Sequence, residues 1–276
     1  MPAHYGHLLA PLVGIVRQAG NRILEIYEAG FEVYTKEDLS PLTDADLASH
    51  RYIVKALGKL TPGWPLMSEE SSEIGWDIRK SWSRYWLIDP LDGTKEFIKH
   101  NGEFTVNIAL IENHKPVLGV VHVPVSAATY YGAVHIGAYC QQGDQDARSI
   151  TTRPAPETGA IVLGSRSHAS PRLRQYLDAL GEHQLSSFGS SLKFCLVAEG
   201  KADLYPRMGP TSEWDTAAAQ AVVEAAGGVV TRTDGRPLEY NLKESILNPE
   251  FLVAGDSSHN WSQFVPPGRG HEEEFK

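Results

Sequence analysis

The chain has 276 residues, of which 42% are hydrophobic and 21% are charged, and its formal net charge is −9. This ordinary globular composition excludes a disordered chain or a coiled coil, and the negative charge disfavours non-specific binding to nucleic acid. At roughly 150 residues per domain, the length predicts one large domain or two closely packed ones. A chain of this length buries enough surface to fold without a disulfide or a structural metal.

Cellular location is predicted from what the sequence lacks. No signal peptide is legible between Met1 and His7, and no apolar run approaches the roughly 18 residues that a membrane span needs. The two cysteines, Cys140 and Cys195, lie far apart, which favours reduced intracellular thiols. We therefore expect a cytoplasmic protein. Peripheral attachment to an inner membrane is an alternative that no basic amphipathic helix supports.

The first part of the chain predicts two amphipathic helices. Apolar residues recur at helical spacing over residues 9–30, with Pro11 in the first turn. Residues 31–34 alternate like a short strand. Thr43 is a natural N-cap for the second helix, which Pro62-Gly63 ends.

A series of strands follows, and then the pattern changes to mixed helices and strands. Short polar turns join most of the early strands, which favours antiparallel pairing. These strands are predicted at residues 65–68, 85–88, 104–111, 116–123 and 129–134. Later strands are predicted at 161–163 and 202–205, and helices at 171–180, 190–198 and 216–226.

A polar stretch at residues 148–156 contains two prolines and is the expected boundary between two lobes. The N-terminal lobe would comprise residues 1–152 and hold an antiparallel sheet. The C-terminal lobe would comprise residues 153–276. Layered α and β elements in two lobes, with a cleft between them, are the architecture that we expect.

The most informative stretch follows a hydrophobic strand. Asp89 and Asp92 flank a turn that Pro90 and Gly93 favour, so their side chains can converge on one point. Two such carboxylates repel each other unless a proton or a cation lies between them. Hard oxygen ligands without a nearby His or Cys favour Mg²⁺, and the Leu91 carbonyl could complete the coordination. The stretch therefore predicts a magnesium site.

The same stretch suits an anion. Gly93 lets the backbone approach a phosphate closely, and the N–H groups of Gly93 and Thr94 would face it. Turn formation alone explains an Asp-Pro or Asp-Gly dipeptide equally well. The full D-P-x-D-G pattern, however, is expected by chance in roughly one chain of this length in a few hundred.

Other acidic residues lie in settings that suit a site. Glu69-Glu70 follows the strand predicted at 65–68, and Asp215 lies at the start of the helix predicted at 216–226. Each of these has a plain structural explanation, because Asp215 and Asp46 could simply belong to helix starts.

Together, Glu69-Glu70, the motif from Asp89 to Thr94, and Trp214-Asp215-Thr-Ala-Ala resemble the inositol monophosphatase superfamily of lithium-sensitive, Mg²⁺-dependent phosphomonoesterases. All three motifs occur in family order, and the resemblance runs from about Leu9 to Phe251. It implies an α+β fold, namely the layered α/β/α/β/α sandwich of the inositol monophosphatase and sugar phosphatase type.

The resemblance also implies roles for residues, with two or three Mg²⁺ ions as cofactors and inhibition by Li⁺. The implied metal ligands are Glu69, Asp89 and the Leu91 carbonyl for a first ion, and Asp89, Asp92 and Asp215 for a second. Thr94 paired with Asp46 would orient and deprotonate the attacking water, and Glu69 would share in catalysis. The residues implied to contact the substrate are Glu69, Leu91, Asp92, Gly93, Thr94, His168, Ser190, Lys193, Arg207 and Asp215.

The second half is similar to the bacterial 3′(2′),5′-bisphosphate nucleotidases of that superfamily. The residues that carry this similarity lie at 189–200, 202–207 and 247–251. Lys193 and Arg207 would suit a second phosphate, and Ser190 and His168 complete the implied nucleotide-binding set. The implied reaction hydrolyses adenosine 3′,5′-bisphosphate to AMP and inorganic phosphate.

Two alternatives remain at this point. A phosphatase for inositol phosphate or fructose 1,6-bisphosphate would share every metal ligand. A sensor that binds nucleotide or metal without turnover would not need the Thr94 and Asp46 pair. The polar loop at residues 71–81 is also a candidate for a mobile lid.

Overall fold

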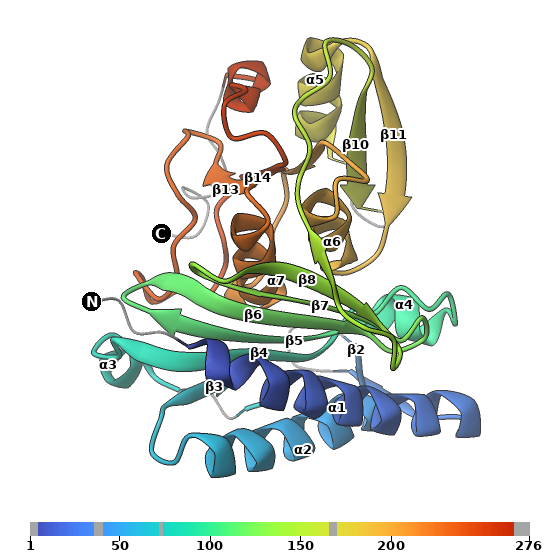
Figure 1. The fold of residues 1–276 in the computed structure, drawn as a ribbon, viewed down its shortest axis with the longest axis vertical. Coiled ribbons are helices and arrows are strands. Elements are labelled where there is room, and N and C mark those ends of the chain that lie inside the picture. The colour runs from blue at the N-terminus through green and yellow to red at the C-terminus, as the bar shows by residue number, and fades with distance from the viewer. Residues whose placement is uncertain (1–4, 36–40, 72–73, 166–169, 268–276) are drawn as a thin grey trace.

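Five layers of helices and sheets are stacked in the computed structural model, which describes residues 5–35, 41–71, 74–165 and 170–267 (Figure 1). Two helices cover the outer face of a seven-stranded sheet, two more lie between this sheet and a five-stranded sheet, and one covers the far face of the smaller sheet. The helices are, in that order, α1 (Leu9–Ala29) with α2 (Asp44–Leu60), α6 (Leu192–Ala198) with α7 (Glu213–Ala225), and α5 (Pro171–Leu180). The predicted α/β/α/β/α sandwich is confirmed.

The larger sheet has the order β3-β4-β5-β6-β7-β8-β9. Its strands pair antiparallel, as expected from the short turns, except that β3 runs parallel to β4. Their bounds are β3 Leu66–Ser68, β4 Arg84–Asp92, β5 Thr105–Glu112, β6 Lys115–Val123, β7 Ala128–Ala133, β8 Gly137–Gln142 and β9 Arg148–Ile150. The sequence did not predict β8 and β9, and β9 extends the first sheet into the polar stretch at 148–156.

The smaller sheet has the order β11-β10-β12-β14-β13. The first three strands are parallel, whereas β14 pairs antiparallel with both β12 and β13. Their bounds are β10 Ala160–Ser165, β11 His183–Phe188, β12 Leu204–Arg207, β13 Val229–Arg232 and β14 Phe251–Ala254. Strands β11, β13 and β14 were not predicted, while helix α5 begins and ends at the predicted residues.

Helix ends follow the local chemistry that the sequence indicated. Helix α1 stops before Gly30, which has a positive φ of 91°. Helix α2 begins after Thr43 in a capping box, in which Thr43 and Asp46 satisfy each other's backbone N–H groups. The strand expected at 31–34 lies slightly later, as β1 (Val33–Thr35), and pairs with β2 (Pro41–Thr43).

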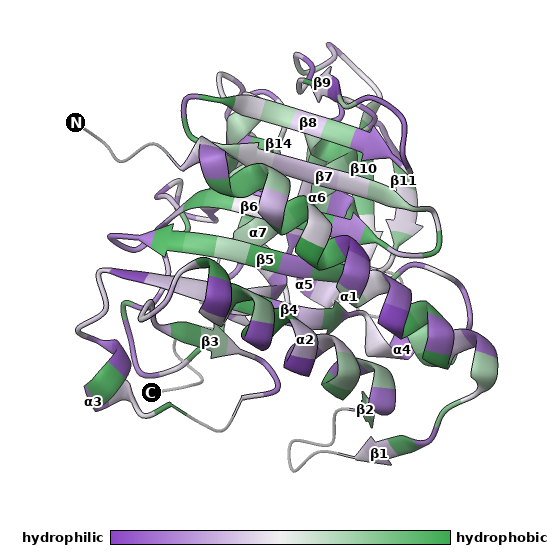
Figure 2. Ribbon diagram, turned by 60° about the horizontal axis from the view of Figure 1, so that its bottom comes forward, coloured by the Kyte–Doolittle hydropathy of each residue, from purple (hydrophilic) through white to green (hydrophobic). Residues whose placement is uncertain are grey.

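Helix α7 packs unusually close to the larger sheet. A Cβ added at Gly119 of β6 would lie 2.0 Å from the Ala218 carbonyl oxygen of α7, so only glycine fits there. The alanines of α7, including Ala217 and Ala221, are buried in the core between the two sheets. Figure 2 shows hydrophobic residues along β5 and β6, at the centre of the larger sheet. This packing holds the first turn of α7 near the end of β4, where the acidic motif lies.

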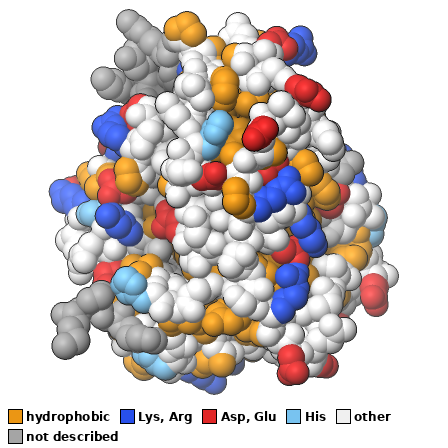
Figure 3. All heavy atoms as spheres, turned by 45° about the horizontal axis from the view of Figure 1, so that its top comes forward, with side chains coloured by type: hydrophobic (Ala, Val, Ile, Leu, Met, Phe, Trp, Pro, Cys, Tyr) orange, Lys and Arg blue, Asp and Glu red, His pale blue; other side chains and the backbone are white. Residues whose placement is uncertain are grey.

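Cys140 and Cys195 are buried free thiols. Among the described residues, no helix combines the length and apolar character needed to cross a bilayer. On the face in Figure 3, basic and acidic side chains are interspersed, and no single sign of charge dominates the face.

Candidate active site

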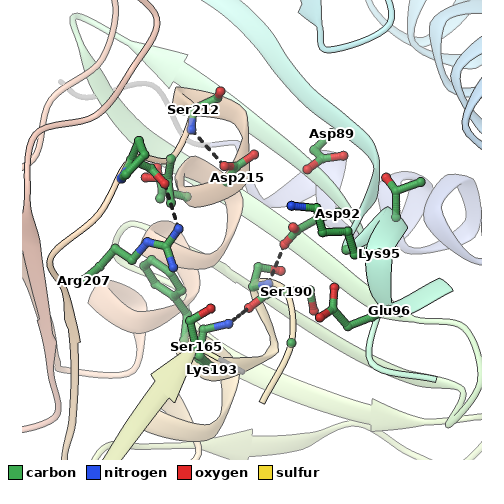
Figure 4. A pocket seen from close by; sticks show the side chains of 18 of the residues that line it. Asp89, Asp92, Lys95, Glu96, Ser165, Ser190, Lys193, Arg207, Ser212 and Asp215 are labelled. Atoms are coloured by element: carbon green, nitrogen blue, oxygen red, sulfur yellow. Dashed lines mark hydrogen bonds between the residues drawn. The ribbon is translucent and has the colours of Figure 1, made fainter. Parts of the chain in front are cut away.

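A cavity of about 440 Å³ lies where the two sheets and their helices meet. One side is formed by the end of β4 and by the short helix α4 (Thr94–Ile98), and the opposite side by the loop before α6, by β12 and by the first turn of α7. Figure 4 shows Asp89, Asp92 and Asp215 converging on this cavity from β4 and α7. Segments from both halves of the chain therefore build one site.

Asp89 and Asp92 lie on one strand, and a bulge brings them together. The sequence predicted that the strand ends at Asp89 and that Pro90 begins a sharp turn, but β4 continues to Asp92. Asp89 pairs with Asn107 and Asp92 with Thr105, so three steps on β4 face two steps on β5. Side chains three apart in a regular strand point to opposite faces. The extra residue reverses this and turns both acids into the cavity.

The sharp turn itself occurs at Gly93, which has a φ of 93°. A Cβ at this position would also lie 3.1 Å from the Glu103 carbonyl oxygen. Upstream, the Ser49 hydroxyl donates to the Pro90 carbonyl at 2.7 Å and ties the bulge to α2. The bulge and the turn are thus fixed by their neighbours.

The three aspartates form one compact oxygen cluster. Asp89, Asp92 and Asp215 each offer a carboxylate oxygen, and these atoms lie within 4.8 Å of one another. Burial, reinforced by Glu69, Asp92 and Asp215, raises the pKa of Asp89 well above its ordinary value. Burial likewise raises the pKa of Asp215 well above its ordinary value, and neighbouring acids add to the effect. Such a cluster is ionised at neutral pH only when positive charge compensates it.

Each of these carboxylates has one oxygen held by a backbone N–H. Leu91 donates to Asp89 Oδ1 at 3.0 Å, Ser191 to Asp92 Oδ2 at 2.5 Å, and Ser212 to Asp215 Oδ2 at 2.8 Å. The second oxygen of Asp89, Oδ2, is buried without a hydrogen-bond partner among the described residues. A buried carboxylate oxygen in this state is suited to a hard cation, so the residues present fit the expected Mg²⁺.

Asp92 differs from the other two because a cation lies near it. Burial raises the pKa of Asp92 to about 6, and the positive charge of Lys193 and the Ser191 N–H oppose that rise. Asp92 is half-buried, while Asp89 is only 1% exposed. The acidic and basic sides of the cavity therefore meet at Asp92.

Glu69 lines the same cavity but is not one of the three clustered acids. Its backbone N–H donates to the Ile88 carbonyl at 3.1 Å, which continues the pairing of β3 with β4 and puts Glu69 beside Asp89. The charge of Glu69 contributes to the raised pKa values of Asp89 and Asp215. The four acids predicted from the sequence thus share one cavity.

Asp46 and Thr94 are brought together from α2 and α4. Asp46 is 1% exposed, and its Oδ2 accepts hydrogen bonds from the Thr43 backbone N–H at 2.8 Å and from the Thr43 hydroxyl at 2.6 Å. The Thr94 hydroxyl lies 3.3 Å from Asp46 Oδ1 and 3.4 Å from the Leu91 carbonyl oxygen. Asp46 therefore contacts both the helix start and Thr94.

The helix-start explanation for Asp46 and Asp215 holds in part. Both residues are the third helical residue (N3) of a capping box and not the N-cap itself. The N-caps are Thr43 for Asp46 and Ser212 for Asp215. Asp215 nevertheless turns a carboxylate oxygen into the acidic cluster. A helix-capping role and a position in the site are thus combined in each residue.

Basic residues line the other side of the cavity. Lys193 is 4% exposed, and its Nζ donates to the carbonyls of Ser190 at 2.6 Å and Phe188 at 3.1 Å. Burial lowers the pKa of Lys193 to about 8, although Asp92 opposes this. Arg207 is 8% exposed and donates to the Pro210 carbonyl at 2.7 Å. Both side chains lie on the cavity wall facing the acids (Figure 4).

One predicted residue is not described by the structure, and some cavity residues were not predicted. His168 lies outside the described residues. Within the loop at 71–81, no residue from 74 to 81 lines the cavity, and buried Arg79 donates to Asn241 at 2.7 Å. Glu96, a buried acid of α4, lines the cavity and was not predicted, because its sequence context suggests only a short helix. Leu247 also lines the cavity, and it belongs to the stretch that carried the nucleotidase resemblance, which was the available signal.

The chain is similar to known proteins over nearly its whole length. The model of the inositol monophosphatase family matches residues 5–261. A curated relative from Escherichia coli O157:H7, 3′(2′),5′-bisphosphate nucleotidase CysQ, is 51% identical over 90% of this chain and 99% of its own length. The protein of the same name from Aggregatibacter actinomycetemcomitans is 38% identical over 95% of this chain and 98% of its own length.

Among solved structures, CysQ from Bacteroides thetaiotaomicron, described as a bacterial member of the inositol monophosphatase family, superposes with a TM-score of 0.78 and 41% identity. It covers 91% of this chain and 99% of its own. The suhB protein of Bartonella henselae shares the fold, with a TM-score of 0.79 at 22% identity over 96% of this chain and all of its own. Since the family match spans nearly the whole chain and the family's metal-dependent chemistry suits the acidic cavity, this chain belongs to the inositol monophosphatase family.

Proposed function

We propose that this protein is a metal-dependent phosphomonoesterase that hydrolyses the 3′-phosphate of adenosine 3′,5′-bisphosphate to give AMP and inorganic phosphate. One observation carries the proposal: Lys193 and Arg207 line the same cavity as the acidic cluster. The cavity therefore offers a metal-binding side for the phosphate to be cleaved and a basic side for the phosphate to be kept. The names of the curated relatives support the same substrate class.

The proposed cofactors are two or three Mg²⁺ ions. The oxygen atoms that would hold them belong to Glu69, Asp89, Asp92, Asp215 and the Leu91 carbonyl. Bound Mg²⁺ would neutralise phosphate charge and lower the pKa of the attacking water. The four acids contribute about −4, which two divalent ions balance, and Li⁺ is expected to inhibit by competing for part of this set.

The chain's own residues would orient the water and the phosphate. Asp46 Oδ1 lies close enough to the Thr94 hydroxyl to accept its proton, so that Thr94 could accept a proton from the water in turn. The water oxygen would form a bond to phosphorus while the bond from phosphorus to the 3′ oxygen breaks. The 3′ oxygen would take up a proton from solvent, and the proton passed through Thr94 to Asp46 would return to solvent, so that the proton count balances. The backbone N–H groups at Gly93 and Thr94 would face the phosphate oxygens.

The retained 5′-phosphate would be bound by the basic side. Lys193 gives two of its three N–H donors to backbone carbonyls of described residues, so one donor is available for a phosphate oxygen. The Arg207 guanidinium offers a planar set of donors. Ser190, which has a positive φ of 47°, lies next to both acids and bases on the cavity wall. His168 stays a predicted member of this set.

Phosphate release measured from three substrates tests the proposal. We expect rapid, Mg²⁺-dependent and Li⁺-inhibited release from adenosine 3′,5′-bisphosphate, and slower release from inositol phosphate and fructose 1,6-bisphosphate. A preference for either sugar phosphate would instead assign the protein to the sugar phosphatases. No release from any of the three would indicate a binding protein without turnover.

A further inference from the structure

Asn248 lies directly beside the first turn of α7, at the back of the cavity wall. The residue is 6% exposed. Its Nδ2 carries two hydrogens, which are shared among three acceptors: the Ser212 carbonyl at 2.8 Å, the Thr216 hydroxyl at 3.0 Å and the Thr211 hydroxyl at 3.2 Å. Its backbone N–H donates to the Thr211 carbonyl at 2.8 Å. One side chain thus contacts the residues on both sides of the helix start.

The direction of these hydrogen bonds is set by the carbonyl of Ser212. A carbonyl oxygen can only accept a hydrogen bond, so the amide nitrogen of Asn248 must face the Ser212 carbonyl. The reversed amide would place Asn248 Oδ1 against that carbonyl oxygen, and two acceptors cannot form a hydrogen bond. Asn248 Oδ1 is buried and has no partner among the described residues. An unpaired buried acceptor is unfavourable. The side chain is therefore oriented by what it donates to α7.

The chain around Asn248 also fixes the backbone of the same turn. Leu247 forms an isolated antiparallel bridge with Ser212, and the Glu213 backbone N–H donates to the Ile246 carbonyl at 2.9 Å. The Ser212 N–H in turn donates to Asp215 Oδ2 at 2.8 Å. A continuous set of hydrogen bonds therefore runs from Asn248 through Ser212 to a carboxylate of the acidic cluster.

We propose that Asn248 is a positioning residue that fixes the first turn of α7 and thereby the orientation of Asp215 toward the metal ions. This role rests on the proposed function, because it takes Asp215 as a metal ligand. Hydrogen bonds to ligating carboxylates set the geometry and affinity of metal sites. It also explains how residues 247–251 serve the site, since Leu247 and Phe251 line the cavity while Asn248 holds the helix behind it.

Metal binding without substrate tests the proposal. Mn²⁺ alone is titrated into the metal-free full chain, and unbound Mn²⁺ is followed by its electron paramagnetic resonance signal. We expect Asn248→Ala to bind Mn²⁺ about tenfold more weakly than the wild type. In turnover, kcat should fall while KM for adenosine 3′,5′-bisphosphate stays within about twofold, because the basic side is untouched.

Gln220→Ala is the matched control for a loss of stability. Gln220 is a buried amide on the same helix, one turn beyond Thr216, and its Nε2 donates to the Leu238 carbonyl at 3.0 Å and to Glu224 at 2.8 Å. The Tyr240 hydroxyl links Gln220 to Thr216, but Gln220 has no direct contact with Ser212 or Asp215 among the described residues. This variant should lower the melting temperature yet bind Mn²⁺ like the wild type. Unchanged Mn²⁺ affinity in Asn248→Ala, or an equal loss in Gln220→Ala, would overturn the role of Asn248.

Two further variants complete the design. If Asn248→Ala does not fold, the isosteric Thr211→Val removes one acceptor of Asn248, and about threefold weaker Mn²⁺ binding is expected, whereas unchanged binding would overturn the proposal. Asp215→Asn reports on the proposed function separately. If Asp215→Asn binds Mn²⁺ like the wild type, Asp215 is not a ligand and the proposed metal site itself is wrong. If Asp215→Asn alone loses affinity, the metal site stands and only the role of Asn248 fails.

Discussion

The backbone N–H of Ser191 donates a 2.5 Å hydrogen bond to Asp92 Oδ2, although the two residues are 99 positions apart in the chain. The Ser191 side chain is anchored as well, with its Oγ 2.8 Å from both Thr105 Oγ1 and Asn107 Oδ1 on β5. Thr105 and Asn107 are the strand partners of Asp92 and Asp89. The start of α6, which carries Lys193, is therefore fastened to the strands that carry the acidic side.

Asp89→Asn should abolish turnover while the fold is kept. Asp89 is the ligand that both proposed metal sites share, so its loss removes a charge and a contact from each. We expect kcat to fall by at least about 100-fold at saturating Mg²⁺. The metal-free variant should melt at a higher temperature than the metal-free wild type, because burial and its acidic neighbours disfavour the Asp89 charge. Near-normal activity at high Mg²⁺ would contradict the assignment.

Thr94→Val and Thr94→Ser separate the hydroxyl from the shape of the side chain. Valine is isosteric but cannot donate to Asp46 or accept a proton from water, so kcat should fall by about 100-fold. Serine keeps the hydroxyl and should stay within about fivefold of the wild type. Steady-state kinetics on adenosine 3′,5′-bisphosphate check both variants. Equal activities of the two variants would show that the hydroxyl takes no part in the reaction.

Lys193→Ala should affect a bisphosphate more than a monophosphate. Loss of a charge-assisted hydrogen bond to the retained phosphate is expected to raise KM for adenosine 3′,5′-bisphosphate about tenfold, and KM for inositol phosphate less than about threefold. Lys201→Ala removes the same charge from an exposed position beside Glu199 and should change neither value. The Lys193 assignment is wrong if both KM values rise by the same factor.

His122 should make stability depend on pH. The residue is buried on β6 under α1, and its Nδ1 lies 3.0 Å from the Thr129 hydroxyl. Burial lowers the pKa of His122 to about 4, and Arg17 adds to the effect. The unfolded chain, with a histidine pKa near 6.5, therefore binds this proton more readily than the folded one. The contribution to stability is complete above pH 6.5 and is lost as the pH falls toward 4.

Urea unfolding at pH 7.5 and pH 4.5 checks the size of this effect. Between these pH values, the wild type should lose about 2–3 kcal/mol more unfolding free energy than His122→Gln, whose side chain does not titrate. The exposed His7 provides the control, because His7→Gln should show the pH dependence of the wild type. The same pH dependence in His122→Gln and the wild type would mean that His122 is not the titrating group.

Local chemistry explains which parts of this structure could be predicted from sequence. Helix α2 is predicted from the Thr43 N-cap, a signal that acts within one turn. Helix α5 is predicted at residues 171–180, and the structure shows that it too has a local start signal, with Ser170 as N-cap and Pro171 in the first turn. Local sequence indicated only that Asp89 and Asp92 could converge, whereas the resemblance carried by the motifs in family order implied that Glu69 and Asp215 join them. Strand β11, by contrast, is polar and largely exposed, so it lacks the alternation of apolar and polar residues from which a strand is predicted.

What the sequence could not show depends on partners distant in the chain. Asp-Pro and Asp-Gly predict a turn at Pro90 because they favour turns locally, whereas pairing with β5 holds these residues extended around a bulge. Hydrophobic periodicity predicts helices and strands but not which distant segments come into contact. It therefore gave no indication of the contact between Ser191 and Asp92 or of the contacts between Asn248 and α7. Glu96 was missed for the same reason, because its burial results from packing and not from its neighbours in sequence.

The backbone N–H groups that hold one oxygen of Asp89, Asp92 and Asp215 have a consequence for ion selectivity. Oxygen atoms that are immobilised during folding lose little further freedom when an ion enters. They also cannot move apart to accommodate a larger ion. Ca²⁺ takes up to about eight oxygen ligands at longer distances, whereas Mg²⁺ requires a small octahedral shell. If these carboxylates hold the metal, their rigidity would favour the smaller ion, and the polypeptide would set this discrimination before any ion arrives.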